Sequence, residues 1–403
     1  MSVHPAPTNS MQELKSCVVH CLRAPYDAQA AAQARACLSN PAFDWPGFLQ
    51  VIHLERISPL IDDSVGGWDL IPTEVAGAVH RAYLQNFWIN ALRLEELQKV
   101  LILLGSAGIP TILLKGVALL HTVYEKSGLR PMVDTDLLIP ARDMDRAEQI
   151  LLSCGYKSNT APSMPLDYQI EIAFQKPGHV PWMIELHSSL FSPPHLLSAE
   201  QLDWFWKNKT CTKKESGDVW TLNPTAQILH LSAHLWLHHG GGDLLGMNDL
   251  YQLIRLYGER IDWEEVVSVA ASFELLLPLQ KVLPELAENW KSPVPGEVLS
   301  KLAKMDPSVR EKRKFMMFWG NDHNYAKTLL GGAMSFSDWR SRLRYARLVL
   351  FPPKQYIIER YKVRTLLLVP FFYAFRLISR GFQQVSRILR KNRKLQQTDH
   401  DKG

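Results

Sequence analysis

The segment "TILLKGVALLHTVYEKSGLRPMVDTDLLIP", residues 111–140, alternates between extended and helical patterns. Its first apolar run ends at Lys115 and Gly116, and a helical pattern follows. Asp134 and Asp136 then lie one residue apart within a second apolar run. Because side chains on a strand alternate between its faces, both carboxylates point the same way. Two adjacent like charges repel unless a cation lies between them, so this pair predicts a cation site.

A third carboxylate lies in the later run "WMIELHSSL", residues 182–190. Glu185 is flanked there by Ile184 and Leu186, and a carboxylate among apolar residues is costly unless it is paired or bound to a metal. Three carboxylates on neighbouring strands would supply hard oxygen ligands for two Mg²⁺ ions. His187, on the same predicted strand face as Glu185, is a candidate supporting partner of the metal site.

Phosphate groups require a second set of contacts. The predicted strand breaks at Gly116, where the backbone can approach a ligand and free amides at a helix N-terminus face an anion. Lys115 adds a positive charge beside this turn. Arg130 is a further nucleotide-binding candidate, either for phosphate or for an ion pair with a carboxylate.

This order of strand, glycine-bearing turn, helix, Asp-x-Asp strand and later acidic strand resembles the DNA polymerase β-like nucleotidyltransferase superfamily. More narrowly, "LLKGVALLHTVY", "LRPMVDTDLLIP", "AEQILLSCGY" and "IELHSSLF" are similar to an uncharacterised bacterial nucleotidyltransferase family with Lys-Gly in the first turn, over residues 35 to about 320. The resemblance implies that Asp134, Asp136 and Glu185 are catalytic metal ligands. It also implies that Lys115 and Gly116 contact the triphosphate.

The implied fold class is α+β, with a small mixed-sheet nucleotidyltransferase core flanked by helical layers. We expect an N-terminal helical region at 1–108, the core at 109–192, a C-terminal helical domain at 193–330 and a basic amphipathic tail at 331–403. The implied activity is Mg²⁺-dependent transfer of a nucleoside monophosphate from a triphosphate, such as ATP, to an acceptor hydroxyl. The first turn departs from the Gly-Ser or Gly-Gly of the broader superfamily. It is similar to that of nucleotidyltransferase toxins, so the acceptor stays open among a small molecule, a protein and tRNA.

The tail carries most of the positive charge. Residues 340–394 hold 15 Lys or Arg against the single acid Glu359, whereas residues 1–339 carry a net charge of −8. Apolar runs accompany these cations, and this combination is typical of segments that lie on an anionic membrane surface. Nucleic acid is the less favoured partner, and pairing with the acidic body of the same chain is a further alternative. The five scattered cysteines and the absence of a secretory pattern favour a reducing, cytoplasmic location, with peripheral binding to the inner face of the membrane.

Two alternatives to catalysis by the carboxylates stay open. One is a non-catalytic, membrane-associated adaptor that keeps the nucleotidyltransferase fold. The other is a metal hydrolase built on the histidine-rich segment, where helical spacing places several imidazoles on one face. Its candidate ligands are His230, His234, His238, His239, Asp243 and Asp249.

Overall fold

The structure is a computed structural model of the whole chain, and it describes only part of it. The described residues are 9–158, 171–178, 182–191, 196–214, 217–318, 333, 336, 338–363, 365–376 and 378–379.

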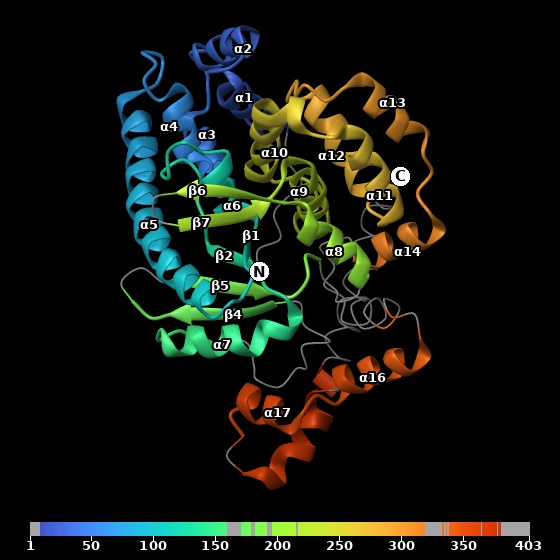
Figure 1. The fold of residues 1–403 in the computed structure, drawn as a ribbon. Helices are drawn as coiled ribbons and strands as arrows, with labels where there is room; N and C mark the ends of the chain where they lie inside the picture. Colours follow the sequence, from blue (N-terminus) through green and yellow to red (C-terminus); the bar gives the residue numbers. More distant parts are fainter. Residues whose placement is uncertain are drawn as a thin grey trace, which may run out of the picture.

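The first part of the chain is helical. It comprises α1 (Asn9–Arg23), α2 (Ala28–Leu38), α3 (Trp45–Leu54), α4 (Ser58–Val65) and α5 (Thr73–Ser106). Short capping signals begin some of these helices: the Asp27 carboxylate accepts the Gln29 and Ala30 amides at the start of α2. The 34-residue helix α5 runs down one side of the sheet in Figure 1, so the predicted helical layer lies beside the strands.

The mixed sheet follows. Its first elements are β1 (Ile112–Leu113), α6 (Lys115–Thr122), β2 (Asp134–Leu138), η1 (Ala141–Asp143), α7 (Met144–Ser153), β3 (Lys157–Ser158), β4 (Glu171–Lys176) and β5 (Trp182–His187). Strands β4 and β5 pair antiparallel, with Lys176 opposite Trp182. Lys115 begins α6 rather than ending β1, so the strand is shorter than the sequence suggested.

The sheet has seven strands in the order β3-β4-β5-β2-β1-β7-β6. The two added strands, β6 (Lys209–Lys214) and β7 (Gly217–Leu222), form a hairpin within the segment that the sequence predicted as helical. Leu113 pairs parallel with Thr221, which joins this hairpin to β1. The α+β fold class is thus confirmed, and the sheet extends beyond residue 192, the expected end of the core.

Further helices gather on the opposite side of the sheet from α5 (Figure 1). They are α8 (Ala199–Lys207), α9 (Pro224–His239), α10 (Leu244–Tyr257), η3 (Gly258–Arg260), α11 (Trp263–Ser272), α12 (Leu276–Glu288), α13 (Gly296–Lys304) and α14 (Val309–Phe318). Helix α9 starts with Asn223 as its cap and ends at Gly240, whose φ of +68° suits glycine. One continuous apolar core, running from Leu14 to Leu302, includes residues of the N-terminal helices, the sheet and these helices, so the three parts stabilise one another.

The described part of the tail forms a small lobe at the foot of Figure 1. It contains α16 (Trp339–Leu350), α17 (Lys354–Tyr361) and η4 (Leu366–Leu368). Phe336 and Tyr345 form an apolar cluster of their own, separate from the main core. Among the described residues, no helix has both the length and the apolar content needed to cross a membrane.

Candidate active site

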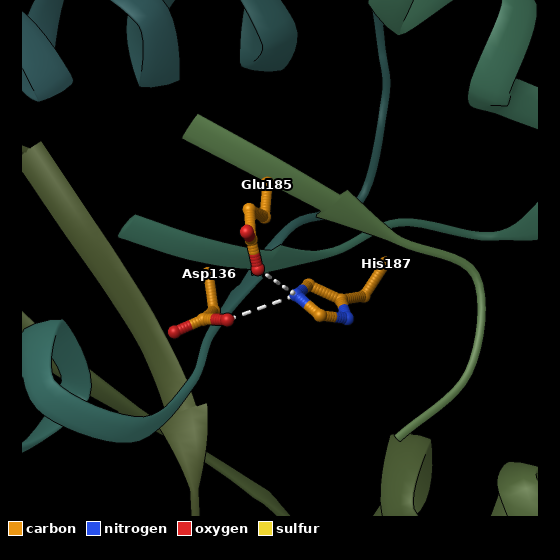
Figure 2. Close-up of side chains that lie close together, drawn as sticks. All are labelled: Asp136, Glu185 and His187. Carbon is orange, nitrogen blue, oxygen red and sulfur yellow. Dashed lines mark hydrogen bonds and ion pairs between the residues drawn. The ribbon is translucent and has the colours of Figure 1, made fainter. Parts of the chain in front are cut away.

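The register between β2 and β5 brings two of the predicted carboxylates together. These strands are parallel, and Asp136 is paired with Glu185 while Leu138 is paired with His187. On the other face of β2, the buried Thr135 hydroxyl accepts a hydrogen bond from Trp182 Nε1 at 3.1 Å, which fixes this register. The carboxylates of Asp136 and Glu185 therefore project side by side from neighbouring strands, as Figure 2 shows.

Asp136, Glu185 and His187 form a compact group that could hold a metal ion. Each offers one ligand atom, and these atoms lie within 4.8 Å of one another. His187 Nε2 lies 2.9 Å from Asp136 Oδ1 and 3.5 Å from Glu185 Oε2 (Figure 2). The carboxylate oxygens suit a hard cation such as Mg²⁺, so this donor set fits the expected group. His187 contacts both carboxylates, as its predicted place on the strand required.

Lys115 supplies a positive charge at the same carboxylate. Its Nζ lies 2.7 Å from Asp136 Oδ1, and the backbone prepares this contact because the Leu114 amide donates to the Asp136 carbonyl at 3.0 Å. Lys115 itself has a φ of +48°, which is strained for a side chain with a Cβ. Its nucleotide-binding role stays a prediction, and in this structure its ammonium group binds the central carboxylate.

These contacts shift the pKa values of the two aspartates in opposite directions. Burial by itself raises the pKa of Asp136, but the ammonium of Lys115 and the imidazole of His187 hold that pKa well below its usual range. Burial and the charges of Asp136 and Glu185 raise the pKa of Asp134. Asp134 therefore experiences the repulsion that the sequence predicted, whereas Asp136 is neutralised by its partners.

The same neighbouring groups shift the pKa of His187. Burial by itself lowers the pKa of His187, but its hydrogen bonds to Asp136 and Glu185 outweigh burial and raise the pKa to about 9. The ring is therefore protonated at neutral pH in this structure. A protonated imidazole supports carboxylates and cannot ligate a metal until it loses its proton.

Asp134 lies on the same cavity but outside the compact group. The loop that precedes it is held by α5, because Asn86 Nδ2 donates to the Gly128 carbonyl at 2.7 Å and Asn90 Nδ2 to the Arg130 carbonyl at 3.0 Å. Arg93 on the same helix donates to the Met132 carbonyl. The N-terminal helical region thus positions the start of β2.

Arg130 forms a buried ion pair that the sequence left as one of two possibilities. Its Nη2 lies 2.8 Å from Asp249 Oδ2 on α10, and the Tyr124 hydroxyl donates to the other oxygen of that carboxylate at 2.6 Å. Burial by itself lowers the pKa of Arg130, but Asp249 outweighs burial and raises it. A Cβ on Gly116 would meet Arg130 Nη1 at 2.4 Å, so glycine is needed here for close approach to this guanidinium.

A cavity of about 450 Å³ connects these groups. The sheet and the start of α6 contribute Lys115, Gly116, Asp134, Asp136, Glu171 and Glu185. Helical segments contribute Arg56, Leu231, His234, Leu235, Asp243, Gly246 and Asp249, while Arg130 and Val133 come from the loop before β2. All six predicted catalytic and nucleotide-binding residues therefore line one cavity, and His187 lies behind two of them.

Sequence reasoning missed Arg56, an exposed residue with a φ of +57° that follows α3. Its neighbour Glu55 anchors the segment by accepting Lys15 Nζ at 2.5 Å and the Leu244 amide at 2.9 Å. Within the described part of the chain, Arg56 forms no ion pair, whereas Lys115 and Arg130 both do. No local motif marks Arg56, because only the packing of α3 near α10 brings it to the cavity.

The histidine-rich segment does not form a second metal cluster among the residues that the structure describes. His234 lines the cavity, and His230 is buried with its ring 5.8 Å from that of Phe191. The Asp243 carboxylate caps α10 by accepting the Leu245 amide, and Asp249 is bound by Arg130. The side chains of His238 and His239 lie outside the described residues. The geometry therefore favours the sheet carboxylates as the metal-binding group.

The part of the chain that contains the cavity is similar to known proteins. The family model described as "Uncharacterised nucleotidyltransferase" matches residues 41–290, which include every lining residue of the cavity. The crystal structure of an antigenic nucleotidyltransferase-like protein from Paracoccidioides brasiliensis matches 50% of this chain and 93% of its own, with a TM-score of 0.32 and 17% identity. No curated protein matches the chain. Because the family match covers more than half of the sequence, the chain belongs to this uncharacterised nucleotidyltransferase family.

Proposed function

We propose that this protein transfers a nucleoside monophosphate from a nucleoside triphosphate to an acceptor hydroxyl in a Mg²⁺-dependent reaction. The observation that carries the proposal is the pairing of Asp136 with Glu185 across β2 and β5, on a cavity that Asp134 also lines. Three carboxylates on one cavity wall, within a nucleotidyltransferase family, support this chemistry over simple nucleotide binding.

Asp134, Asp136 and Glu185 are the residues that would hold Mg²⁺. Bound there, two Mg²⁺ ions would lower the pKa of the acceptor hydroxyl and neutralise the triphosphate. The acceptor oxygen bonds to the α-phosphorus while the bond to the bridging oxygen of the β-phosphate breaks. Pyrophosphate leaves with that electron pair, and Glu185 takes the hydroxyl proton in our assignment.

The triphosphate requires cationic and amide contacts from this chain. The first amides of α6 receive no side-chain cap, and Gly116 lines the cavity at that point. These amide groups can therefore donate hydrogen bonds to a bound anion. Arg56 is our further candidate for the phosphates, since no carboxylate of the described residues neutralises it. Lys115 would also contact the triphosphate. When a divalent cation binds the carboxylates, the Lys115 ammonium would leave Asp136 and bind a phosphate oxygen.

The acceptor enters the proposal only by class. A cavity of about 450 Å³ accommodates part of a nucleotide, and we assign its helical side to the acceptor. A small molecule, a protein and tRNA all carry suitable hydroxyls, so the assay must sample all three classes.

The direct test is incubation of the purified chain with each labelled nucleoside triphosphate and Mg²⁺ in cell lysate, followed by separation of small molecules, protein and RNA. We expect label from the α-phosphate, and not from the γ-phosphate, to enter one class. Chelation of Mg²⁺ and the Asp136→Asn substitution should both remove the signal. Label transfer that persists in Asp136→Asn would contradict the assignment.

One observation favours a second candidate, a non-catalytic binding protein. Lys115 and His187 both bind the Asp136 carboxylate, and side chains of the chain itself would neutralise this aspartate in a binding site that has no catalytic role. A thermal-shift titration separates the two functions. A catalytic site should be stabilised by nucleoside triphosphate only when Mg²⁺ is present, whereas a degenerate site should show no Mg²⁺-dependent shift.

A further inference from the structure

The lobe formed by α16, α17 and η4 exposes an unusual concentration of apolar side chains. We call this set the apolar tail face, and its members are Leu366, Leu367, Leu368, Phe371 and Phe375. Leu367 is 87% exposed and Phe371 62% exposed. The rings of Phe371 and Phe375, one helical turn apart, are stacked with centroids 6.4 Å apart, so they lie on the same side of the segment. Contiguous exposed apolar residues of this kind mark an interaction surface.

The apolar tail face is held by specific contacts and is not a loose end. Arg376 is buried and donates to the carbonyls of Val349 and Leu350 at 2.8 and 3.0 Å, which ties the segment to α16. The Tyr373 hydroxyl donates to the Pro352 carbonyl. These contacts hold the segment against α16 while its apolar side chains stay exposed.

The neighbouring helices α16 and α17 of the lobe, and the residue that follows α17, carry exposed cations. They are Arg340, Arg342, Arg344, Arg347, Lys354, Arg360 and Lys362. Within the described part of the chain, none of these seven side chains forms an ion pair with a carboxylate, although the body of the protein is acidic. Pairing of the described tail with the acidic body therefore does not account for its charge.

We propose that the lobe binds the anionic surface of a lipid bilayer, with the apolar tail face inserted among the acyl chains and these cations at the headgroups. The net charge of +14 over residues 340–394 complements an anionic leaflet, such as the cytoplasmic one. Trp339, which is 67% exposed, and the partly buried Tyr361 are amphipathic rings suited to the headgroup region. Nucleic acid would use the cations but would leave the exposed leucines without a partner.

Flotation of the full-length chain with vesicles tests the proposal independently of nucleotidyl transfer. The protein should float with vesicles of phosphatidylcholine and phosphatidylglycerol, much less with phosphatidylcholine alone, and more weakly as salt increases. Equal binding to both vesicles, or binding to neither, would overturn the proposal. So would a monomer-to-dimer change in light scattering that depends on the apolar tail face while vesicles are not bound, or tight binding to duplex DNA without binding to vesicles.

Two sets of substitutions measure the apolar and the electrostatic contributions to vesicle binding separately. The apolar variant combines Leu366→Ser, Leu367→Ser and Phe371→Ser, and its matched control combines Leu54→Ser, Leu92→Ser and Ile102→Ser, which are also exposed. We expect the partition coefficient onto the vesicles to fall by at least about 10-fold in the apolar variant and to change little in the control. All the substituted side chains are exposed, so a thermal melt should show both variants folded.

The charge variant combines Arg340→Gln, Arg344→Gln and Lys362→Gln, with Arg81→Gln, Lys281→Gln and Lys301→Gln as its control at exposed positions on the body. Each cation near an anionic surface contributes about a fivefold change in partitioning, so the charge variant should lose on the order of 100-fold. Equal losses in the variant and its control would show only a dependence on net charge and would contradict a specific tail surface.

Discussion

The two walls of the cavity differ in how their charges are placed. On the sheet wall, Asp134, Asp136 and Glu185 come from strands whose register fixes the spacing of the carboxylates. On the helical wall, Asp249 is bound by Arg130, while Arg56 keeps an unneutralised charge among the described residues. The sheet wall concentrates three carboxylates, one of which is bound by Lys115, whereas the helical wall contributes Asp249, which Arg130 binds. A site for a metal ion and a triphosphate requires two kinds of charge. Carboxylates bind the metal ion, and a positively charged side chain binds the phosphates.

The strongest test of the sheet wall is Asp136→Asn. Loss of this charge should lower turnover by on the order of 10³-fold or more, because the residue is central to the proposed metal site. Steady-state label transfer measures the effect. Glu171→Gln is the matched control, since Glu171 is an exposed carboxylate at the same cavity, 3.7 Å from His187 Nδ1, that we do not assign to the metal. Turnover of Glu171→Gln should stay within about 10-fold of the parent. Comparable losses in the two variants would remove the special role of Asp136.

The strongest test of the helical wall is Asp249→Leu. It leaves the buried Arg130 guanidinium without its carboxylate, so the free energy of unfolding should fall by about 3–5 kcal/mol. Chemical denaturation provides the measurement. The double variant Arg130→Met, Asp249→Leu should recover most of this loss because neither charge remains. Equal losses in the single and double variants would show that the pair is not the stabilising element.

Arg56→Ala tests the cation that the sequence did not reveal. A phosphate contact from an exposed arginine should raise KM for the nucleoside triphosphate by roughly 10-fold, with a smaller effect on kcat. Arg81→Ala is the control, since Arg81 is exposed on α5 and does not line the cavity. An unchanged KM in Arg56→Ala would exclude Arg56 from triphosphate binding.

The smallest expected effect compares the two aspartates without metal. Asp136 is ionised and held by Lys115 and His187, so Asp136→Asn should lower Tm in the presence of chelator. The pKa of Asp134 is raised by burial and neighbouring carboxylates, so Asp134→Asn should leave Tm unchanged or raise it, within about 1 kcal/mol of stability. Thermal melts followed by circular dichroism measure the Tm of both variants. Shifts of the same sign and size would mean that the aspartates share one environment.

The surroundings of Asp136 differ from what its spacing on the strand indicated. That spacing predicted repulsion between the carboxylates of Asp134 and Asp136. Lys115, whose predicted role is at the triphosphate, contacts Asp136 at 2.7 Å and offsets the repulsion at that carboxylate, whereas Asp134 still experiences it. The turn that contains Lys115 was visible in the sequence, but its position beside Asp136 depends on the hydrogen bond from the Leu114 amide, just after β1, to the Asp136 carbonyl within β2.

The sequence alone determined the α+β fold class and the carboxylate-bearing strands, because strand alternation and turn residues are local properties. It also indicated that His187 lies beside Glu185, which is a matter of spacing on one strand. The hairpin β6–β7 escaped prediction because its place in the sheet comes from the pairing of Leu113 with Thr221, residues distant in the chain. The Arg130–Asp249 pair and the approach of Arg56 to the cavity likewise depend on how the helical layers pack. Local patterns thus specified the carboxylates of the candidate site, and long-range packing chose their partners.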